Sequence, residues 1–438
     1  MHFLDIDLYK LVNQCAIHRH FPDAEATWKF TSRSPNFLVT EAAFGSIKSQ
    51  IEGLRDVVIT DAELDFLRKE CPYFSDKYLE YLASFRYRVE NLSITFKPVA
   101  LYQFNPDGEG LGSIEIGAQG NWCETTLFEA PVLQILAEAF HRYVLPYTGD
   151  YSGQEETAYN KASLFIRSGI RFAQFGSRRR RSLYGQEMVT RGLQRAQLDI
   201  GRDESSRCFL GSSNVHICRV LGLKPLSTMS HEWFMGVGAI LDDYSRVTVD
   251  GLSLWVDCYG PWLKQGHMFG LALPDTFGSN FFLQDFEGIY TTKNQNSRLD
   301  KVPFTSIFAG LRQDSGDAEQ FISLAREFYS NISLSNRNHV SVDDHSDQPL
   351  LMFSDSLTLA KCRNLAEIAQ EAGFETCFGV GSALTNDFPD RHRNPSIVFK
   401  LNTVDGKMAV KISDVPGKGH GDADTIAKIL ERQTAMKF

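Results

Sequence analysis

The chain has 438 residues, of which 43% are hydrophobic and 23% are charged, as is ordinary for a globular protein of about two domains. Its formal net charge of −9 argues against a general binder of nucleic acids or of anionic membranes. We expect neither a signal peptide nor a membrane span, because the start lacks a basic region with an apolar run and no stretch approaches ~20 consecutive apolar residues.

Residues 1–147 are predicted to form an amino-terminal α/β domain, because helical and strand-like segments are mixed along them. Strand-like runs such as "NLSITF" follow helical ones such as "DKYLEYLASF". The run at 129–144 is typical of a helix, since Pro131 suits its first turn and apolar residues recur at helical spacing. The polar stretch at 147–161 indicates a linker.

Residues 148–395 are predicted to form a β/α barrel-like catalytic domain. Short apolar runs end in small or charged residues and are followed by helical stretches; the runs are "RFAQFGSR", "CFLGSSN", "PLSTMSH", "LALPDTFG", "SIFAGLRQDSGD", "LLMFSDS" and "CFGVGSAL". Alternating strands and helices indicate βαβ units on a parallel sheet or barrel. Ligands of such folds gather at the carboxyl ends of the strands, so we expect these polar residues on one rim.

Residues 396–438 show another pattern. Two β-rich runs flank Asp405–Gly406, a pair that strongly favours a hairpin turn, and a helix-like tail follows. We expect this hairpin and helix to return to the first domain.

The eight cysteines are scattered along the chain without a Cys-x-x-Cys pair. This usage is typical of thiols in a reducing compartment and not of a disulfide framework or a zinc site. It predicts a cytoplasmic location.

Four arginines, Arg178 to Arg181, follow the apolar run "RFAQFGS". Arginines at a strand end can hold a phosphate or a carboxylate through bidentate hydrogen bonds. We predict that Arg178 and Arg179 bind an anion and that the other two are solvated. A nuclear-import or RNA-contact tract is the alternative, which the acidic net charge and the lack of an aromatic-rich basic face disfavour.

Three other runs carry residues suited to a phosphorylated sugar. Arg312 and Asp314 supply an anion contact and a hydrogen-bond acceptor at one strand end. Asp355 is suited either to accept hydrogen bonds from a vicinal diol such as a ribose or to cap the next helix. The backbone amides around Gly381 and Ser382 can cradle a phosphate.

His231 stands in "STMSHEWFM", three residues after a hydroxyl side chain and just before an acid and three large apolar residues. Taken alone, such a ring is usually a packed histidine with one satisfied nitrogen. A reactive imidazole needs a strand end and anion sites nearby, and the runs described above supply both.

Over most of the chain, these motifs resemble those of the nicotinate phosphoribosyltransferases. The resemblance rests on the order and spacing of "DLYKL", "FGSRR", "GSSNV", "STMSHEW", "DTFGSNFF", "GLRQDSGD", "FSDSL", "FGVGSALTND" and "VKISDVPGK", and it is strongest to the bacterial and fungal branch. It implies a type II phosphoribosyltransferase: an irregular β/α barrel with an α/β amino-terminal domain completed by the carboxyl-terminal hairpin. It also implies a homodimer with active sites at the subunit interface.

The family reaction transfers the 5-phosphoribosyl group of 5-phosphoribosyl 1-diphosphate to nicotinate, giving nicotinate mononucleotide and diphosphate, the first step of NAD salvage from nicotinate. The resemblance also implies coupled ATP hydrolysis through a phosphorylated histidine, which matches His231. A neutral imidazole can attack a γ-phosphate directly. We see no metal-ligand spacing, so Mg²⁺ is expected to arrive with the phosphate groups.

Roles in binding the base and its neighbours also follow from the resemblance. Tyr9 matches a tyrosine that reaches the pyridine ring from the neighbouring subunit, and Phe175 would stack on the other face of that ring. Arg178 and Arg312 match cationic contacts around the substrates, and Thr228 matches a hydroxyl contact.

The remaining matches concern the phosphoribosyl group. Asp314 would orient the base or the neighbouring arginine, and Asp355 would bind the ribose hydroxyls. Gly381 and Ser382 match the 5′-phosphate loop. The chain departs from the family pattern at Ser382 and Ser212, where threonine is frequent, and both changes preserve a hydroxyl.

Two alternatives remain at this point. One is a nicotinamide phosphoribosyltransferase of the same fold. The other is a non-catalytic nucleotide- or RNA-binding protein that uses the arginine run. The acidic charge and the complete set of phosphate-binding motifs favour an enzyme that binds neither nucleic acid nor membranes.

Overall fold

The computed structural model describes residues 1–34, 37–99, 110–145, 149–201, 207–292, 298–335, 348–388, 395–415 and 419–435. The chain divides into two compact units, each assembled from separate segments. Unit 1 comprises Met1–Ile166, Ala173–Leu226 and Val380–Gly406. Unit 2 comprises Arg167–Phe172, Ser227–Gly379 and Lys407–Phe438.

Unit 1 contains an antiparallel sheet in the order β13-β1-β4-β2, with β3 also paired to β4. Its strands are β1 (Glu25–Ser32), β2 (Val39–Thr40), β3 (Leu92–Pro98), β4 (Leu111–Asn121) and β13 (Ile397–Val404). Side chains of β1 alternate between buried and exposed, as expected for a strand with one face on the core. Trp28 lies opposite Leu401, and Phe30 opposite Phe399. A segment from late in the chain thus completes the first sheet.

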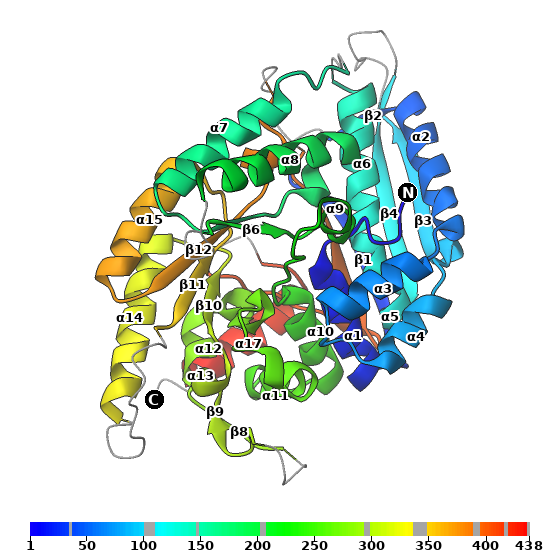
Figure 1. Cartoon of the computed structure of the whole chain (residues 1–438). Coiled ribbons are helices and arrows are strands. Elements are labelled where there is room, and N and C mark those ends of the chain that lie inside the picture. The colour runs from blue at the N-terminus through cyan, green and yellow to red at the C-terminus, as the bar shows by residue number, and fades with distance from the viewer. Residues whose placement is uncertain are drawn as a thin grey trace. The chain divides into compact units, whose positions relative to one another are not determined.

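Helices cover this sheet and the rest of unit 1. They are α1 (Leu8–His20), α2 (Glu41–Glu52), α3 (Asp61–Glu70), α4 (Asp76–Ser84), α5 (Trp122–Thr125), α6 (Glu129–Tyr143), α7 (Gln154–Arg167), α8 (Leu183–Ile200), α9 (Val215–Leu221) and α16 (Ser382–Thr385). Figure 1 shows α6 running along the sheet, and this helix buries a nearly continuous apolar face. The short strands β5 (Phe172–Gln174) and β6 (Phe209–Ser212) precede the arginine run and α9.

A reciprocal cap fixes the start of α3. The Thr60 hydroxyl accepts a hydrogen bond from the Glu63 backbone N–H at 3.3 Å, and the Glu63 carboxylate accepts one from the Thr60 N–H at 3.0 Å. This capping box satisfies two backbone donors that the first helical turn leaves unpaired. It also holds the buried Glu63 side chain in one place.

Unit 2 is built on parallel strands. Strands β7 (Leu271–Ala272), β10 (Gly310–Gln313), β11 (Leu350–Phe353) and β12 (Glu375–Val380) pair in the order β7-β10-β11-β12. Leu271, Leu311 and Leu351 are fully buried, as expected for strands covered on both faces. Helices follow the strands, and polar residues occupy the strand-to-helix connections.

Unit 2 contains further helices and short strands. They are α10 (His231–Leu241), α11 (Val247–Tyr259), α12 (Ser279–Phe286), β8 (Ile289–Tyr290), β9 (Val302–Pro303), α13 (Phe304–Ile307), α14 (Ala318–Ser335), α15 (Leu359–Glu371), β14 (Lys407–Met408) and α17 (Ala423–Ala435). The strand and helix alternation confirms the predicted α/β class.

Two local predictions have different outcomes. The turn at Asp405–Gly406 is confirmed, since their φ angles are 48° and 77°, the left-handed conformation that a two-residue hairpin needs. The linker predicted at 147–161 is wrong for its second half, because α7 begins at Gln154. The apolar stripe of α7 starts with the small residues Ala158 and Ala162, which are hard to recognise in a polar stretch.

The domain boundaries predicted at 147 and 395 remain predictions. The compact units are cut at other positions, and the predicted segment 396–438 is shared between them: β13 belongs to unit 1, whereas residues 407–438 belong to unit 2.

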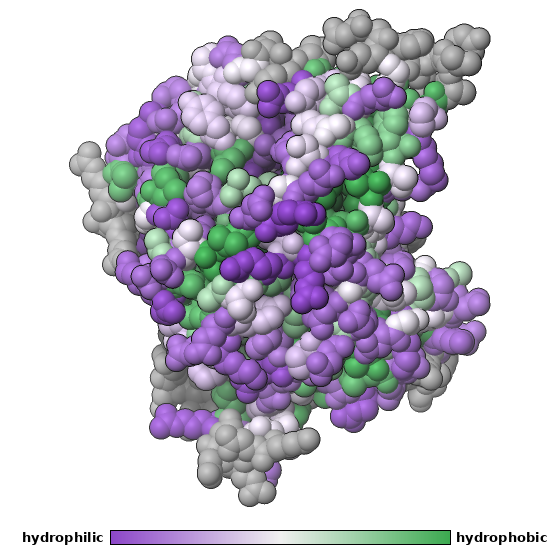
Figure 2. All heavy atoms as spheres, turned by 90° about the vertical axis from the view of Figure 1, so that its right-hand side faces the viewer, coloured by the Kyte–Doolittle hydropathy of each residue, from purple (hydrophilic) through white to green (hydrophobic). Residues whose placement is uncertain are grey.

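The polarity of the surface and the state of the cysteines agree with what the composition indicated. Hydrophilic side chains predominate on the face drawn in Figure 2, with smaller groups of hydrophobic ones between them. Among the described helices, none combines the length and the apolar character needed to span a bilayer. The eight cysteines all lie in the described part of the chain and remain thiols, and all except Cys258 are buried.

Candidate active site

His231 is the first residue of α10, directly after Ser230 in extended conformation. The large apolar residues that follow it, Trp233, Phe234 and Met235, are buried and anchor the helix in unit 2. The His231 side chain itself is 19% exposed. The apolar stretch therefore fixes the helix, and the imidazole remains accessible at its amino-terminal end.

Four polar side chains surround the imidazole of His231. Nδ1 lies 3.1 Å from the hydroxyl of Thr276. Nε2 lies 2.9 Å from Nζ of Lys411, 3.1 Å from Oδ2 of Asp314 and 3.6 Å from Oδ1 of Asp275. One ring nitrogen thus contacts a neutral hydroxyl, and the other faces one cation and two acids.

The electrostatic surroundings favour a neutral imidazole. Burial lowers the pKa of His231, and the Lys411 ammonium lowers it further, whereas Asp275 and Asp314 act in the opposite direction; the net shift of the pKa is downward. A lysine ammonium is only a donor, so its contact with Nε2 fits a lone pair on that nitrogen, whereas the contact of the Asp314 carboxylate with the same nitrogen fits a proton there. In the tautomer that carries its proton on Nδ1, this nitrogen donates to Thr276 and Nε2 has the free lone pair.

Asp275 is a buried carboxylate held by donors. Its Oδ2 accepts hydrogen bonds from Lys411 Nζ at 2.9 Å and from the Ser315 hydroxyl at 2.6 Å. Burial alone would raise the pKa of Asp275, but His231 and Lys411 shift it below the usual value. Its Oδ1 has no hydrogen-bond partner among the described residues, which leaves an acceptor next to the imidazole.

Arg312 organises the end of β10. It donates to the Thr228 hydroxyl and the Met229 carbonyl at 2.9 Å each, to the Ser354 hydroxyl at 2.9 Å and to Asp314 Oδ1 at 2.7 Å. A guanidinium has five N–H groups, so within the described residues these bonds leave one for a ligand. Although burial would raise the pKa of Asp314, Arg312 and His231 hold it well below its usual value.

Asp355 follows β11 and is partly exposed. The Ser356 hydroxyl donates to its carboxylate at 3.0 Å. The next helix, α15, is capped by Thr358, whose hydroxyl accepts from the Lys361 N–H at 3.3 Å. The alternative that Asp355 caps this helix is therefore wrong.

In unit 1, Tyr9 and Arg178 lie together. The Arg178 guanidinium is 5.6 Å from the centroid of the Tyr9 ring and donates to Glu129 at 3.0 Å. Lys10 contacts the other oxygen of Glu129 at 2.5 Å. Burial would raise the pKa of Glu129, but Lys10 and Arg178 keep it below its usual value. Arg178 is 46% exposed, so this cation can also reach a ligand.

The prediction that Arg180 and Arg181 are solvated is wrong. Arg180 is 2% exposed and makes a bidentate pair with Asp5 at 2.6 and 2.7 Å, with a further bond to Glu138 at 2.9 Å. Arg181 is 9% exposed, donates to Asn386 at 2.8 Å and lies over the ring of Phe388. Buried cations require such partners.

Phe175 and the predicted phosphate loop also come together in unit 1. The Phe175 N–H donates to the Val380 carbonyl at 2.8 Å, directly before Gly381. Ser382 is the first residue of α16. Next to Phe175, Gly176 is packed so closely that a Cβ atom would lie 1.9 Å from the hydroxyl oxygen of Thr385.

The predicted residues therefore form groups within each unit, while their individual roles remain predictions. Unit 2 brings together Thr228, His231, Arg312 and Asp314, with Asp355 one residue after Ser354. Unit 1 brings together Tyr9 with Arg178, and Phe175 with Gly381 and Ser382.

Sequence reasoning missed several contacts of His231. Lys411, Asp275 and Thr276 all touch its ring but received no role. The signal was present, since they stand in "VKISD" and "DTFGS", two motifs on which the family resemblance rests.

Comparisons with known proteins show the family of the chain. The family model of the nicotinate phosphoribosyltransferase (NAPRTase) family matches residues 170–435, and that of its amino-terminal domain matches residues 4–137.

Individual relatives are similar over nearly the whole chain. A probable nicotinate phosphoribosyltransferase of Schizosaccharomyces pombe is 35% identical over 97% of this chain and 95% of its own length. The nicotinate phosphoribosyltransferase of Saccharomyces cerevisiae is 32% identical over 98% and 94%. A crystal structure of a putative nicotinate phosphoribosyltransferase from Saccharomyces cerevisiae superposes with a TM-score of 0.85 at 31% identity, covering 98% and 97% of the two chains. The chain therefore belongs to the nicotinate phosphoribosyltransferase family, a family of enzymes.

Proposed function

We propose that this chain transfers the 5-phosphoribosyl group of 5-phosphoribosyl 1-diphosphate to nicotinate, and that ATP hydrolysis drives the transfer through a phosphorylated His231. Family membership and the names of the relatives support the transfer and the acceptor. The coupling rests on one observation: the Nε2 atom of an imidazole whose pKa is lowered lies among Lys411, Asp275 and Asp314.

In the phosphorylation step, the lone pair of Nε2 attacks the γ-phosphorus of ATP. The P–N bond forms as the bond to the bridging oxygen breaks, and that oxygen leaves on ADP with the bonding electrons. Nδ1 keeps its proton and its contact with Thr276, so no base is required. Lys411, which contacts Nε2 before attack, is then positioned to donate to an oxygen of the transferred phosphate.

Mg²⁺ is proposed to enter with ATP and with the diphosphate groups of the substrates. The carboxylates of Asp275 and Asp314 fit such an ion, because both are kept ionised by lowered pKa values and Asp275 Oδ1 has no hydrogen-bond partner in the described part of the chain. When bound, the ion neutralises part of the phosphate charge.

The transfer step breaks the bond between the ribose anomeric carbon and diphosphate, so positive charge develops on the sugar. We assign the ribose hydroxyls to Asp355, the 5′-phosphate to the Gly381–Ser382 loop and the nicotinate carboxylate to Arg178. Electrostatic stabilisation of the leaving diphosphate and alignment of the pyridine nitrogen supply the rate acceleration.

The proposal includes two further points that come from the family resemblance. Tyr9 would reach the pyridine ring bound by a neighbouring subunit, and the active form would be a homodimer. The cytoplasmic location remains a prediction.

Among the competing functions, RNA binding by the arginine run is no longer supported, because Arg180 and Arg181 are buried in internal contacts.

The product assay runs nicotinate and nicotinamide in parallel, each with and without ATP. We expect nicotinate mononucleotide and diphosphate as products, with ATP stimulating the reaction and nicotinamide used poorly. Equal use of the two bases would contradict the proposed acceptor.

The coupling is tested with γ-labelled ATP. The parent chain should acquire an acid-labile, base-stable phosphate, the lability of a phosphoramidate and not of a serine or threonine ester. His231→Asn removes the nucleophile, so it should lose the label and the ATP stimulation but keep slow ATP-independent transfer. Retention of the label on His231→Asn would disprove the phosphohistidine. A packing role would instead lower thermal stability and both activities together.

A further inference from the structure

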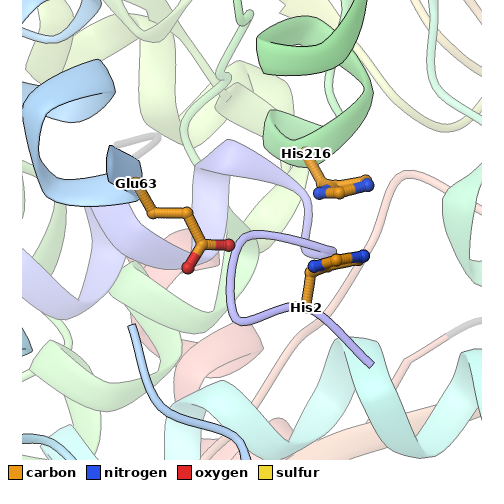
Figure 3. A group of neighbouring side chains, drawn as sticks. All are labelled: His2, Glu63 and His216. Atoms are coloured by element: carbon orange, nitrogen blue, oxygen red, sulfur yellow. The ribbon is translucent and has the colours of Figure 1, made fainter. Parts of the chain in front are cut away.

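A second cluster of ionisable side chains lies in unit 1, apart from the residues assigned above. It consists of His2, Glu63 and His216, whose nearest ligand atoms all lie within 4.8 Å of one another. Figure 3 shows the two imidazole rings face to face, with the Glu63 carboxylate directed toward the pair. We propose that this cluster binds one divalent transition-metal ion of the Zn²⁺ type.

Backbone contacts hold the three segments in register. The Leu4 N–H donates to Glu63 Oε1 at 3.3 Å, and the Leu4 carbonyl accepts from the His216 N–H at 2.8 Å. The Val215 N–H adds a bond to the Ile6 carbonyl at 3.0 Å. The segment before α1 is therefore tied to the first turn of α3 and to the first turn of α9, so the three ligands are brought together by the fold.

The His216 side chain is buried, and one of its ring nitrogens, Nδ1, is available as a metal ligand. The residue is 5% exposed, and its Nδ1 has no hydrogen-bond partner in the part of the chain that the structure describes. A buried polar atom without a partner is uncommon and calls for a ligand.

The donor set suits zinc. Two imidazoles and one carboxylate are ligands that Zn²⁺ accepts, with water as the fourth. Two ligands of a tetrahedral zinc ion lie about 3.4 Å apart, so the cluster has to contract by roughly 1.4 Å at most. The rings, now 3.9 Å apart and inclined by 13°, have to tilt toward one another. His2 is exposed and can turn, while the cap holds Glu63.

The ion would act on structure and not on the His231 chemistry. It would fasten the segment before α1, which carries Asp5 and Asp7. Asp5 pairs with Arg180, and Asp7 accepts hydrogen bonds from Ser177 and Ser213. Zinc should therefore stabilise the folded chain, because a ligand that binds only the folded state shifts the unfolding equilibrium.

The test is a calorimetric titration of the chelator-treated full chain with Zn²⁺ in the absence of substrates. We expect one ion per chain and a rise in Tm. His2→Ala, His216→Gln and Glu63→Gln should each weaken binding at least about tenfold. Glutamine at position 63 can still complete the capping box, and His2 is exposed, so these two variants are expected to fold. His18→Ala, which removes another imidazole of unit 1, should bind zinc like the parent chain.

Co²⁺ provides the second measurement. A site of two histidines and a carboxylate should give ligand-field bands without a thiolate-to-cobalt charge-transfer band, and these bands should disappear in His2→Ala. Zinc binding of equal strength in His2→Ala and the parent chain, a thiolate band, or no binding by the parent chain would each overturn the proposal.

Discussion

The two ring nitrogens of His231 have different partners, and in the proposed phosphorylation this asymmetry selects Nε2 as the attacking atom. Thr276 holds Nδ1, while Nε2 faces Lys411 and two carboxylates. Lys411 is the one cation in this set, and it contributes to the lowered pKa of His231. The charge of Lys411 should therefore influence the pH range over which the imidazole can be phosphorylated.

Replacing Lys411 with methionine removes this cation and should raise the pKa of His231. The imidazole is then protonated up to a higher pH, so the acidic limb of label incorporation from ATP should move upward in pH. Lys407→Met is the matched control, because Lys407 is 47% exposed and pairs with Asp242 away from the ring. An unchanged acidic limb in Lys411→Met would contradict the role given to this lysine.

Arg312 is expected to act through the groups that it positions. Arg312→Ala removes a charge-assisted contact of about 1.5–3 kcal/mol, so kcat/KM should fall about ten- to a hundredfold. Arg312→Lys keeps the charge but cannot reach Thr228, Ser354 and Asp314 at once, and it should lose nearly as much. Steady-state kinetics of both variants show whether Arg312 acts by its charge alone or by positioning its neighbours. If lysine restores activity, the charge alone matters.

At the same scale, motif order predicts which residues lie together better than it predicts what each of them contacts. Motif order identified His231, Arg312 and Asp314, which do lie together. The burial of Arg180 could not be foreseen, because its partners Asp5 and Glu138 are distant in sequence. A run of like charges is usually solvated, and only tertiary contacts reveal the exception.

At the scale of elements, the periodicity of apolar residues predicted the class of the fold. It did not predict where every helix begins or how the chain is divided into units. Alternating apolar runs correctly indicated most of the parallel strands and the polar residues at their ends. The run at 225–230, directly before His231, is the exception, because it forms only an isolated bridge between Pro225 and Ser212. The first half of α7 escaped detection because alanines form its buried stripe. The split of the chain into units made of separate segments also left no local signal, since it depends on pairing between β1 and β13.

The packing of Gly176 against Thr385 can be tested. Gly176→Ala places a methyl group where the hydroxyl oxygen is 1.9 Å away, and such overpacking should lower the free energy of unfolding by about 1–3 kcal/mol. Gly45→Ala in α2 is the control, since nothing lies within 4 Å of its added Cβ. It should stabilise the helix by about 0.5–1 kcal/mol. Denaturant titrations measure both, and equal stabilities would contradict the packing argument.

At the scale of the whole molecule, the proposed homodimer predicts complementation. If Tyr9 serves the neighbouring subunit, Tyr9→Ala and His231→Ala chains each lack ATP-stimulated activity alone but form one intact site in a mixed dimer. Co-refolding the two variants should therefore restore part of the ATP-stimulated activity. Subunit exchange is verified with differently tagged chains. An isolated mixed dimer without ATP-stimulated activity would argue against an active site shared between subunits.

The pairing of β1 with β13 has a consequence for biosynthesis. On the ribosome, β1 and β4 emerge early, but the partner for the other edge of β1 appears only when most of the chain has been made. Until then a strand with three buried side chains presents unpaired N–H and C=O groups, a surface prone to aggregation. Nascent chains of this protein should thus depend on chaperones that bind exposed strands, and release of the carboxyl-terminal segment should be the event that ends this dependence.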